Sequence, residues 1–178
     1  MVVTLHQEAV LFVSRTGRVL TLRPCTPEDA PLIADLYRRV SDRALHLRFC
    51  SSALSISPEG EAARLCGGNP EEQAVFLAVD GGEVVGIGEV VREDEETGEI
   101  AFLVRDDCQS EGIGTALAER LVEAAREMGF ARLRAYLLYE NHGMRRLLAK
   151  LPFPRTAEGS WGELCVTLEI GCAAAAHR

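Results

Sequence analysis

Lysine is almost absent from this sequence of 178 residues, in which Lys150 is the only lysine among 19 basic side chains. The formal net charge is −8, and the arginines form no concentrated basic segment along the chain. Binding to nucleic acid or to an anionic membrane surface depends on concentrated positive charge. We therefore expect no nucleic-acid partner and no membrane partner.

Patterns for metals, disulfides and export are also missing. The cysteines include no CxxC pair, which argues against a zinc site and against a disulfide framework. They are Cys25, Cys50, Cys66, Cys108, Cys165 and Cys172. No apolar run approaches the roughly 18 residues of a membrane span, and the N-terminal segment lacks the charged, apolar and small-residue order of a signal peptide. These absences predict a cytoplasmic protein without a bound metal.

What is present is enough apolar sequence for one core. A hydrophobic content of 47% in 178 residues supports one domain, and the chain is too short for two domains of ordinary size. No linker, internal repeat or low-complexity segment divides it. We predict a single domain over residues 1–178, with its core at about residues 19–170.

Hydrophobic periodicity predicts a mixed α/β fold with a change of pattern along the chain. Strands are expected at residues 2–13, 19–23, 74–79, 83–92, 99–105, 132–138 and 161–170. Helices are expected from Thr26, with Asp29 as its capping partner, and at residues 41–49, from 57, 113–128 and 141–151. The central strands should form an antiparallel meander.

The segment "QSEGIGT", residues 109–115, joins the last strand of this meander to the next helix. A strand that feeds a helix through a turn leaves backbone N–H groups unpaired, with the positive end of the helix dipole behind them. Glycines at 112 and 114 would let a phosphate approach those groups. The alternative is that Gly112 and Gly114 only ease a tight turn.

Two common nucleotide-binding motifs do not fit this segment. A dinucleotide fingerprint needs a third glycine where the chain has Leu117, and it should open a parallel β-α-β unit. A P-loop needs Gly-Lys-Ser/Thr, whereas the chain has Gly114-Thr115-Ala116. The remaining pattern is Gln-x-x-Gly-x-Gly after a strand.

That pattern resembles the pyrophosphate-binding signature of the GNAT superfamily of acetyl-CoA-dependent N-acetyltransferases. The segment from Glu99 to Val104 is similar to the fourth strand of that family, and "ENHGMRRLLAKLPF", residues 140–153, is similar to its "N..a...l.k.GF" segment. The resemblance covers roughly Arg23 to Ile170. It implies an α/β (α+β) fold with a central, mostly antiparallel, splayed sheet flanked by helices.

The resemblance also implies a set of residues for the cosubstrate acetyl-CoA. Leu103 and Val104 would contact the pantetheine arm, and Asn141 would hydrogen-bond it unless it serves only as a helix cap. The pyrophosphate would be cradled by Gln109, Ser110, Glu111, Gly112, Ile113, Gly114 and Thr115. The chain departs from the family in two places. Glu111 stands where a basic residue is frequent, and Leu148 stands where many members have a tyrosine acid.

Acetyl transfer to an alkyl amine needs a base, because such an amine is mostly protonated at neutral pH. Glu99 is the candidate, since certain protein acetyltransferases of the family have a catalytic glutamate at the matching place. The alternative is that Glu99 only ends an exposed acidic turn. Glu89, Glu140 and His142 are weaker candidates for the base, and Cys108 is a minor candidate for an acyl relay.

The acceptor is indicated by "LYRRVSDRALHLRF", residues 36–49, which resembles a segment of bacterial Pat-type protein lysine acetyltransferases. This likeness implies transfer to a protein lysine. The sequence leaves the oligomeric state open, with a homodimer among the possible states. Two packed amphipathic helices would give the same pattern. Transfer to a small-molecule amine and an acyl-CoA-binding regulatory module without catalysis remain alternatives.

Overall fold

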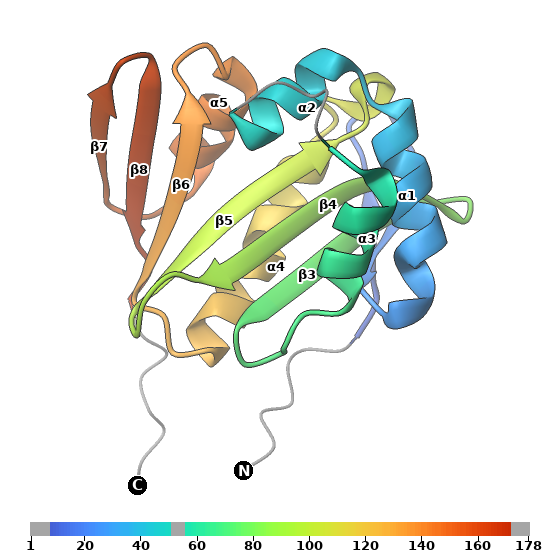
Figure 1. The fold of residues 1–178 in the computed structure, drawn as a ribbon, viewed down its shortest axis with the longest axis horizontal. Coiled ribbons are helices and arrows are strands. Elements are labelled where there is room, and N and C mark those ends of the chain that lie inside the picture. Colours follow the sequence, from blue (N-terminus) through green and yellow to red (C-terminus); the bar gives the residue numbers. More distant parts are fainter. Residues whose placement is uncertain (1–7, 51–55, 172–178) are drawn as a thin grey trace, which may run out of the picture.

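One eight-stranded sheet runs through the molecule, which we describe from a computed structural model for residues 8–50 and 56–171 (Figure 1). The strand order is β1-β2-β3-β4-β5-β6-β8-β7, and every pair is antiparallel except β5 with β6. The strands are β1 (Val10–Val13), β2 (Val19–Pro24), β3 (Gln73–Asp80), β4 (Glu83–Arg92), β5 (Thr97–Val104), β6 (Arg132–Leu138), β7 (Arg155–Ser160) and β8 (Glu163–Glu169). The predicted mostly antiparallel, splayed α/β sheet is confirmed.

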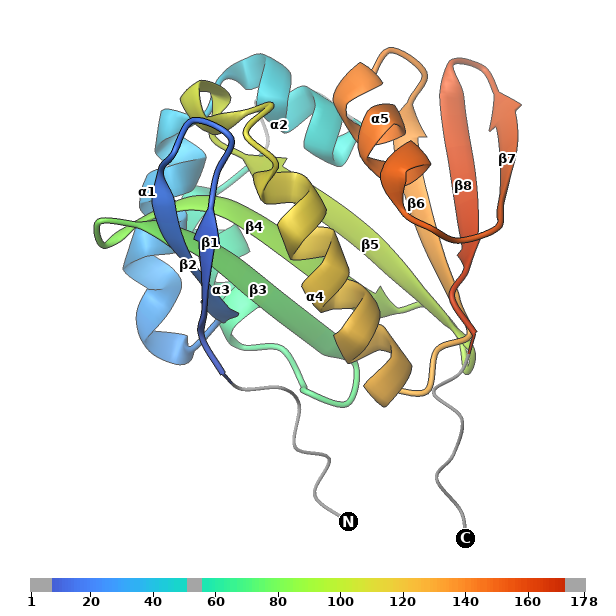
Figure 2. The same ribbon diagram turned by 180° about the vertical axis from the view of Figure 1, so that it is seen from behind.

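Helices cover both faces of the sheet (Figures 1 and 2). One face carries α4 (Ile113–Glu127) and α5 (His142–Lys150), and the other carries α1 (Ala30–Arg39), α2 (Asp42–Phe49) and α3 (Pro58–Cys66). Leu117 and Leu121 of α4 are fully buried against the sheet, and so is Ile33 of α1. The helical spacing of these apolar residues explains why each helix lies on the sheet.

Local capping signals act as the sequence predicts. The backbone N–H of Thr26 donates to Asp29 Oδ2 at 2.8 Å, at the start of a short 3-10 turn (Pro27–Asp29) that leads into α1. Arg23 binds both oxygens of the same carboxylate, at 2.6 and 2.7 Å. At the end of α4, Gly129 takes a φ of +86°, a left-handed conformation typical of a helix stop.

The parallel pair β5–β6 is short, and this shapes the centre of the molecule. The two strands pair at only three positions, Thr97 with Arg132, Gly98 with Leu133, and Glu99 with Arg134. Beyond Glu99, β5 stays paired with β4 as far as Val104, while β6 continues in register with β8. The two ribbons diverge in Figure 1, and the β6-facing backbone edge of residues 100–104 is left without a strand partner.

The C-terminal strands differ from the prediction. The predicted last strand over 161–170 corresponds to β8, but β7 was not predicted. The two strands form a hairpin around Trp161 and Gly162, whose φ angles are +54° and +91°. The sequence of β7, "RTAEGS", is exposed throughout and lacks apolar alternation, so it carries no strand signal. Of the predicted first strand, residues 2–7 lie outside the described part, and β1 occupies Val10–Val13 of the remainder.

Three expectations about composition can be compared with the described residues. Five of the cysteines are free thiols there, and Cys172 lies outside the described part. Groups of three or more potential metal ligands are not found in residues 8–50 and 56–171. No helix in the same ranges is long and apolar enough to cross a membrane.

Candidate active site

The glycine turn, residues 109–112, connects the end of β5 to α4 by way of a 3-10 turn at Asp106–Cys108. Ser110 and Gly112 both take left-handed conformations, with φ angles of +64° and +94°. The Gln109 side chain donates from Nε2 to the Val104 carbonyl at 3.1 Å and so ties the turn to β5. The first N–H groups of α4, which have no acceptor within the helix, therefore lie next to the unpaired end of β5.

The two glycines of the turn are needed for different reasons. A Cβ added to Gly112 would meet no atom closer than 3.5 Å, but its φ of +94° is rarely adopted by other residues. A Cβ added to Gly114 would lie 2.8 Å from Leu147 Cδ1, so Gly114 permits the close approach of α4 and α5. Turn geometry and packing thus account for both positions, and neither excludes the predicted approach of a phosphate.

Glu111 does not point at the place where a phosphate would lie. Its carboxylate is buried and accepts a hydrogen bond from Thr16 Oγ1 at 2.7 Å, while Arg18 Nε lies 3.5 Å away. Hydrogen bonds from Ser14 and Thr16, with the nearby Arg18 charge, lower the pKa of Glu111 below its ordinary value. The carboxylate is thus directed to the β1–β2 turn, and only the backbone of Glu111 remains for a cosubstrate contact.

Glu99 lies at the vertex where β5 and β6 begin to part. It is inside β5, opposite Arg134, and so does not belong to the acidic turn before the strand. Burial of the carboxylate raises the pKa of Glu99, and the charges of Arg48, Glu89 and Glu93 modify this effect. The side chain still reaches solvent, which an acceptor amine requires.

Comparison with known proteins identifies the fold and the family. Residues 43–153 match the model of the Acetyltransferase (GNAT) family. This chain belongs to the GNAT family. The matched model describes a family of acetyltransferases. The sequence-based identification of the family is confirmed.

Individual relatives agree with this assignment. The acetyltransferase Pat of Mycolicibacterium smegmatis is 30% identical over 147 residues, which are 77% of this chain and 42% of that protein. The GNAT domain of S. lividans PAT superposes with a TM-score of 0.82 at 25% identity, over 90% of this chain and 96% of that one. YncA of Salmonella typhimurium, a putative acetyltransferase whose structure contains acetyl-CoA, shares the fold with a TM-score of 0.71 at 22% identity. The superposition covers 89% of this chain and 98% of that one. The chain thus spans less than half of the curated relative.

Two further GNAT positions have structural roles in this chain. Asn141 caps α5, because its Oδ1 accepts from the Met144 N–H at 3.0 Å and its Nδ2 donates to the Leu47 carbonyl of α2 at 3.4 Å. Its contact with the pantetheine arm stays a prediction. Leu148 is only 2% exposed and packs in the core beneath α5, so this position supplies no acid.

The weaker candidates are placed less well for catalysis. Glu89 is buried, although its place in a strand could equally have turned it to solvent. Its carboxylate is held by ion pairs with Arg48 and Arg64, the latter at 2.8 Å. Cys108 is fully buried, and burial raises the pKa of its thiol, which disfavours the reactive thiolate. His142 and Glu140 flank Asn141 beyond the end of β6, away from the vertex at Glu99.

The face of the sheet that carries Glu99 continues across β6 and β8. Strand pairing sets Glu99, Arg134 and Tyr136 on one face, and Tyr136 lies opposite Cys165 on β8. The Tyr136 hydroxyl donates to Glu93 Oε1 at 2.8 Å. A pocket of about 430 Å³ lies there, lined in part by Cys50, Tyr136, Glu158, Ser160, Glu163 and Cys165. Sequence reasoning missed this pocket, because β7 carried no strand signal.

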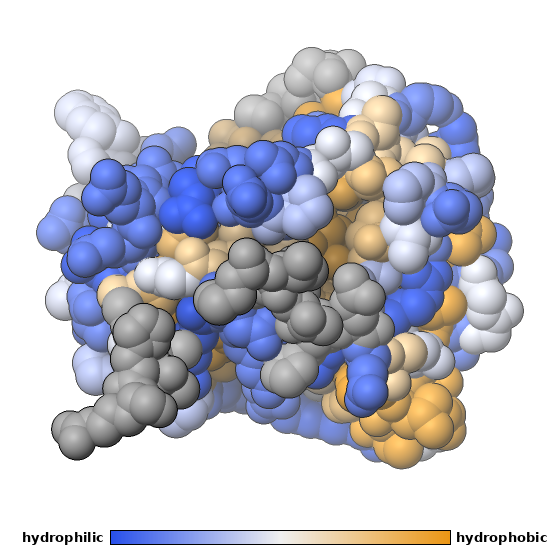
Figure 3. All heavy atoms as spheres, turned by 90° about the horizontal axis from the view of Figure 1, so that it is seen from below, coloured by the Kyte–Doolittle hydropathy of each residue, from blue (hydrophilic) through white to orange (hydrophobic). Residues whose placement is uncertain are grey.

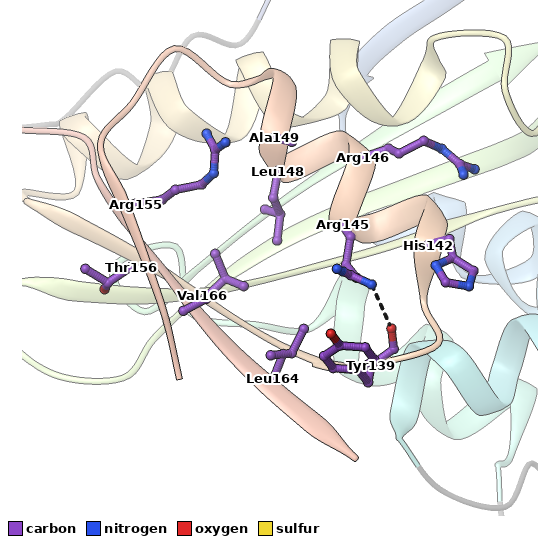
Figure 4. A pocket seen from close by; sticks show the side chains of 11 residues that line it. Tyr139, His142, Arg145, Arg146, Leu148, Ala149, Arg155, Thr156, Leu164 and Val166 are labelled. Carbon is purple, nitrogen blue, oxygen red and sulfur yellow. Dashed lines mark hydrogen bonds between the residues drawn. The ribbon is translucent and has the colours of Figure 1, made fainter. Parts of the chain in front are cut away.

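A larger pocket, of about 690 Å³, lies on the opposite face between α5 and the β7–β8 hairpin (Figure 4). Leu148, Leu164 and Val166 line it, and Arg145 bonds back to the Tyr139 carbonyl at 3.4 Å. Arg146 points away from it in Figure 4. Since the sheet separates this pocket from Glu99, we do not assign it to the acceptor.

Substitution of Gly112 tests the glycine turn. Gly112→Val should weaken coenzyme A binding at least tenfold, about 1.4 kcal/mol, because a β-branched residue cannot hold a φ of +94° and the turn must rearrange. Isothermal titration calorimetry measures this effect. Gly82→Val is the matched control, since Gly82 has a φ of +91° in the β3–β4 turn. Unchanged binding by Gly112→Val would remove the turn from the site.

Proposed function

We propose that this domain transfers the acetyl group of acetyl-CoA to a lysine side chain of another protein, with Glu99 as general base. The observation that carries the proposal is the divergence of β5 from β6. It leaves the edge of β5 unpaired between Glu99 at the vertex and the glycine turn at the open end. At about 3.3 Å per residue, this edge extends roughly 17 Å.

An extended pantetheine arm can bind such an edge in the manner of an added strand. Its amides would pair with the free backbone groups near Leu103 and Val104. The pyrophosphate would then meet the N–H groups at the start of α4, where the helix dipole favours negative charge. This arrangement directs the thioester along β5 toward Glu99.

The chemistry follows from these positions. The amine nitrogen attacks the thioester carbon, and its proton passes to the Glu99 carboxylate, directly or through one water. The carbon–sulfur bond breaks, and the sulfur leaves with the electron pair as a thiolate. A backbone N–H of the unpaired edge near Leu103 would stabilise the oxyanion. The raised pKa of Glu99 supports the role, since a base is most effective near the working pH.

A protein lysine as acceptor is supported by two features. The relatives above include an acetyltransferase Pat and the GNAT domain of a PAT, and this agrees with the likeness of residues 36–49 to Pat-type enzymes. The acceptor face also carries the carboxylates of Glu93, Glu99, Glu158 and Glu163. Negative charge there suits a lysine with basic neighbours.

A small-molecule amine is a second candidate, because the pocket of about 430 Å³ beside Tyr136 could hold one. Incubation with labelled acetyl-CoA and either a cell extract or a panel of small amines separates the two. Label on proteins, read by gel and mass spectrometry, supports the lysine acceptor. Label only on small amines would contradict it.

Self-acetylation should be close to absent in the same assay. Lys150 is the only lysine, and it lies at the C-terminal end of α5. Intact-mass spectrometry after incubation with acetyl-CoA should therefore show at most a trace of product on lysine side chains. A Lys150→Arg variant should transfer label to extract proteins as well as the natural sequence does. A loss of transfer in that variant would mean that Lys150 takes part in the reaction.

A further inference from the structure

We propose that Arg15, in the turn between β1 and β2, contacts the pyrophosphate of acetyl-CoA and replaces the basic residue that the glycine turn lacks. This inference rests on the proposed cosubstrate site at the start of α4. It assigns a binding role to a residue that lies more than 90 positions before the glycine turn in the sequence. Arg15 also lies outside residues 43–153, which match the family model.

The β1–β2 turn is fixed directly against the glycine turn, as their adjacent positions in Figure 2 show. The Arg15 N–H donates to the Glu111 carbonyl at 3.0 Å, and Thr16 Oγ1 donates to the Glu111 carboxylate at 2.7 Å. Arg18 lies 3.5 Å from that carboxylate and also binds Asp80 at 3.0 Å. Backbone and side-chain contacts thus hold the two turns together.

Arg15 lies beside the bare face of Gly112. Its Nε is 3.9 Å from the place that a Cβ on Gly112 would take. The side chain is exposed, and within the described ranges it forms no ion pair. Arg18, three residues on, is already engaged by Asp80 and Glu111. Arg15 is therefore the arginine of this turn that is free to bind an added anion.

Charge and geometry favour a phosphate as that anion. A guanidinium offers donors in a planar fork that matches phosphate oxygens, and charge-assisted bonds of this kind are stronger than neutral ones. The net charge of −8 repels a polyanion such as coenzyme A at long range, so a local cation matters more here than on a neutral protein. Because Gly112 directly precedes α4, a phosphate on the first N–H groups of α4 would lie within reach of Arg15.

This explains why glutamate is tolerated at position 111. Its carboxylate is neutralised by the β1–β2 turn, and the same contacts present Arg15 to the site. Glu111 is accordingly a positioning residue. Its negative charge is directed away from the pyrophosphate.

The test is calorimetric titration of Arg15→Gln with coenzyme A, dephospho-coenzyme A and pantetheine. Affinity for the first two should fall about tenfold, since both carry the pyrophosphate and one charge-assisted contact is worth roughly this factor. Affinity for pantetheine, which has no phosphate, should not change. The salt dependence of coenzyme A binding should also weaken, because one ionic contact is lost. Arg155→Gln is the matched control, since Arg155 is exposed on β7 and belongs to neither the glycine turn nor the β1–β2 turn. This variant should bind all three compounds as the natural sequence does.

The outcomes separate this inference from the proposed function. If the natural sequence binds coenzyme A and Arg15→Gln binds it equally well, Arg15 has no such role and the proposed function stands. A loss with coenzyme A but not with dephospho-coenzyme A would place Arg15 at the 3′-phosphate and overturn the pyrophosphate assignment. If the natural sequence binds none of the three compounds, both proposals fail.

Discussion

Replacing Glu99 with glutamine should lower turnover by on the order of 10² to 10⁴, with little change in acetyl-CoA affinity. Glutamine keeps the size of the side chain but cannot accept the proton of the amine. Steady-state rates with a lysine peptide, together with calorimetry for acetyl-CoA, measure both effects. Glu96→Gln is the matched control, because Glu96 lies in the acidic turn before β5 and binds Arg132 at 3.0 Å. It should keep turnover within a few-fold of the natural sequence.

The dependence of the rate on pH distinguishes lost base catalysis from a disturbed strand. A base works in its deprotonated form, and burial raises the pKa of Glu99. The natural enzyme should therefore gain activity as pH rises through that raised pKa and then level off. Glu99→Gln should continue to gain activity at high pH, where solvent supplies the neutral amine. Near-normal turnover of the variant across the range would place the base elsewhere.

Replacing Glu89 with alanine should destabilise the domain by about 3 kcal/mol or more, because the substitution leaves the buried charge of Arg48 without its partner. The side chains of Arg48 and Glu89 are only 12% and 5% exposed, and Arg64 and Gln73 also bind the carboxylate. Chemical unfolding followed by circular dichroism measures the loss of stability.

Glu59→Ala is the matched control for this substitution. Glu59 pairs with Arg38, but these two side chains are 66% and 51% exposed, and exposed pairs contribute at most about 1 kcal/mol. A double variant, Arg48→Met with Glu89→Leu, should be more stable than Glu89→Ala alone, because it removes both charges. Equal effects of Glu89→Ala and Glu59→Ala would show that the buried pair adds no stability.

The sequence by itself determined most elements and the place of the glycine turn. The meander, the helix from Ile113, the strand at 132–138 and the cap at Thr26 were all predicted, and the family was confirmed. These features depend on local signals, such as apolar spacing, capping side chains and glycines, which act over a few residues. The resemblance to certain protein acetyltransferases of the family also made Glu99 a candidate before any contact was known.

Tertiary structure alone decided how distant segments share the site. The three-position pairing of β5 with β6, the burial of Glu89 beneath α2 and α3, and the contact of Glu111 with the β1–β2 turn join residues far apart in the chain. No periodicity encodes such contacts, because they depend on which sheet edges and helix faces meet. For the same reason, the sequence showed that an acidic residue, Glu111, stands where the family often has a basic one, but it could not show which residue compensates. Only the packing of the β1–β2 turn against the start of α4 brings Arg15 beside Gly112.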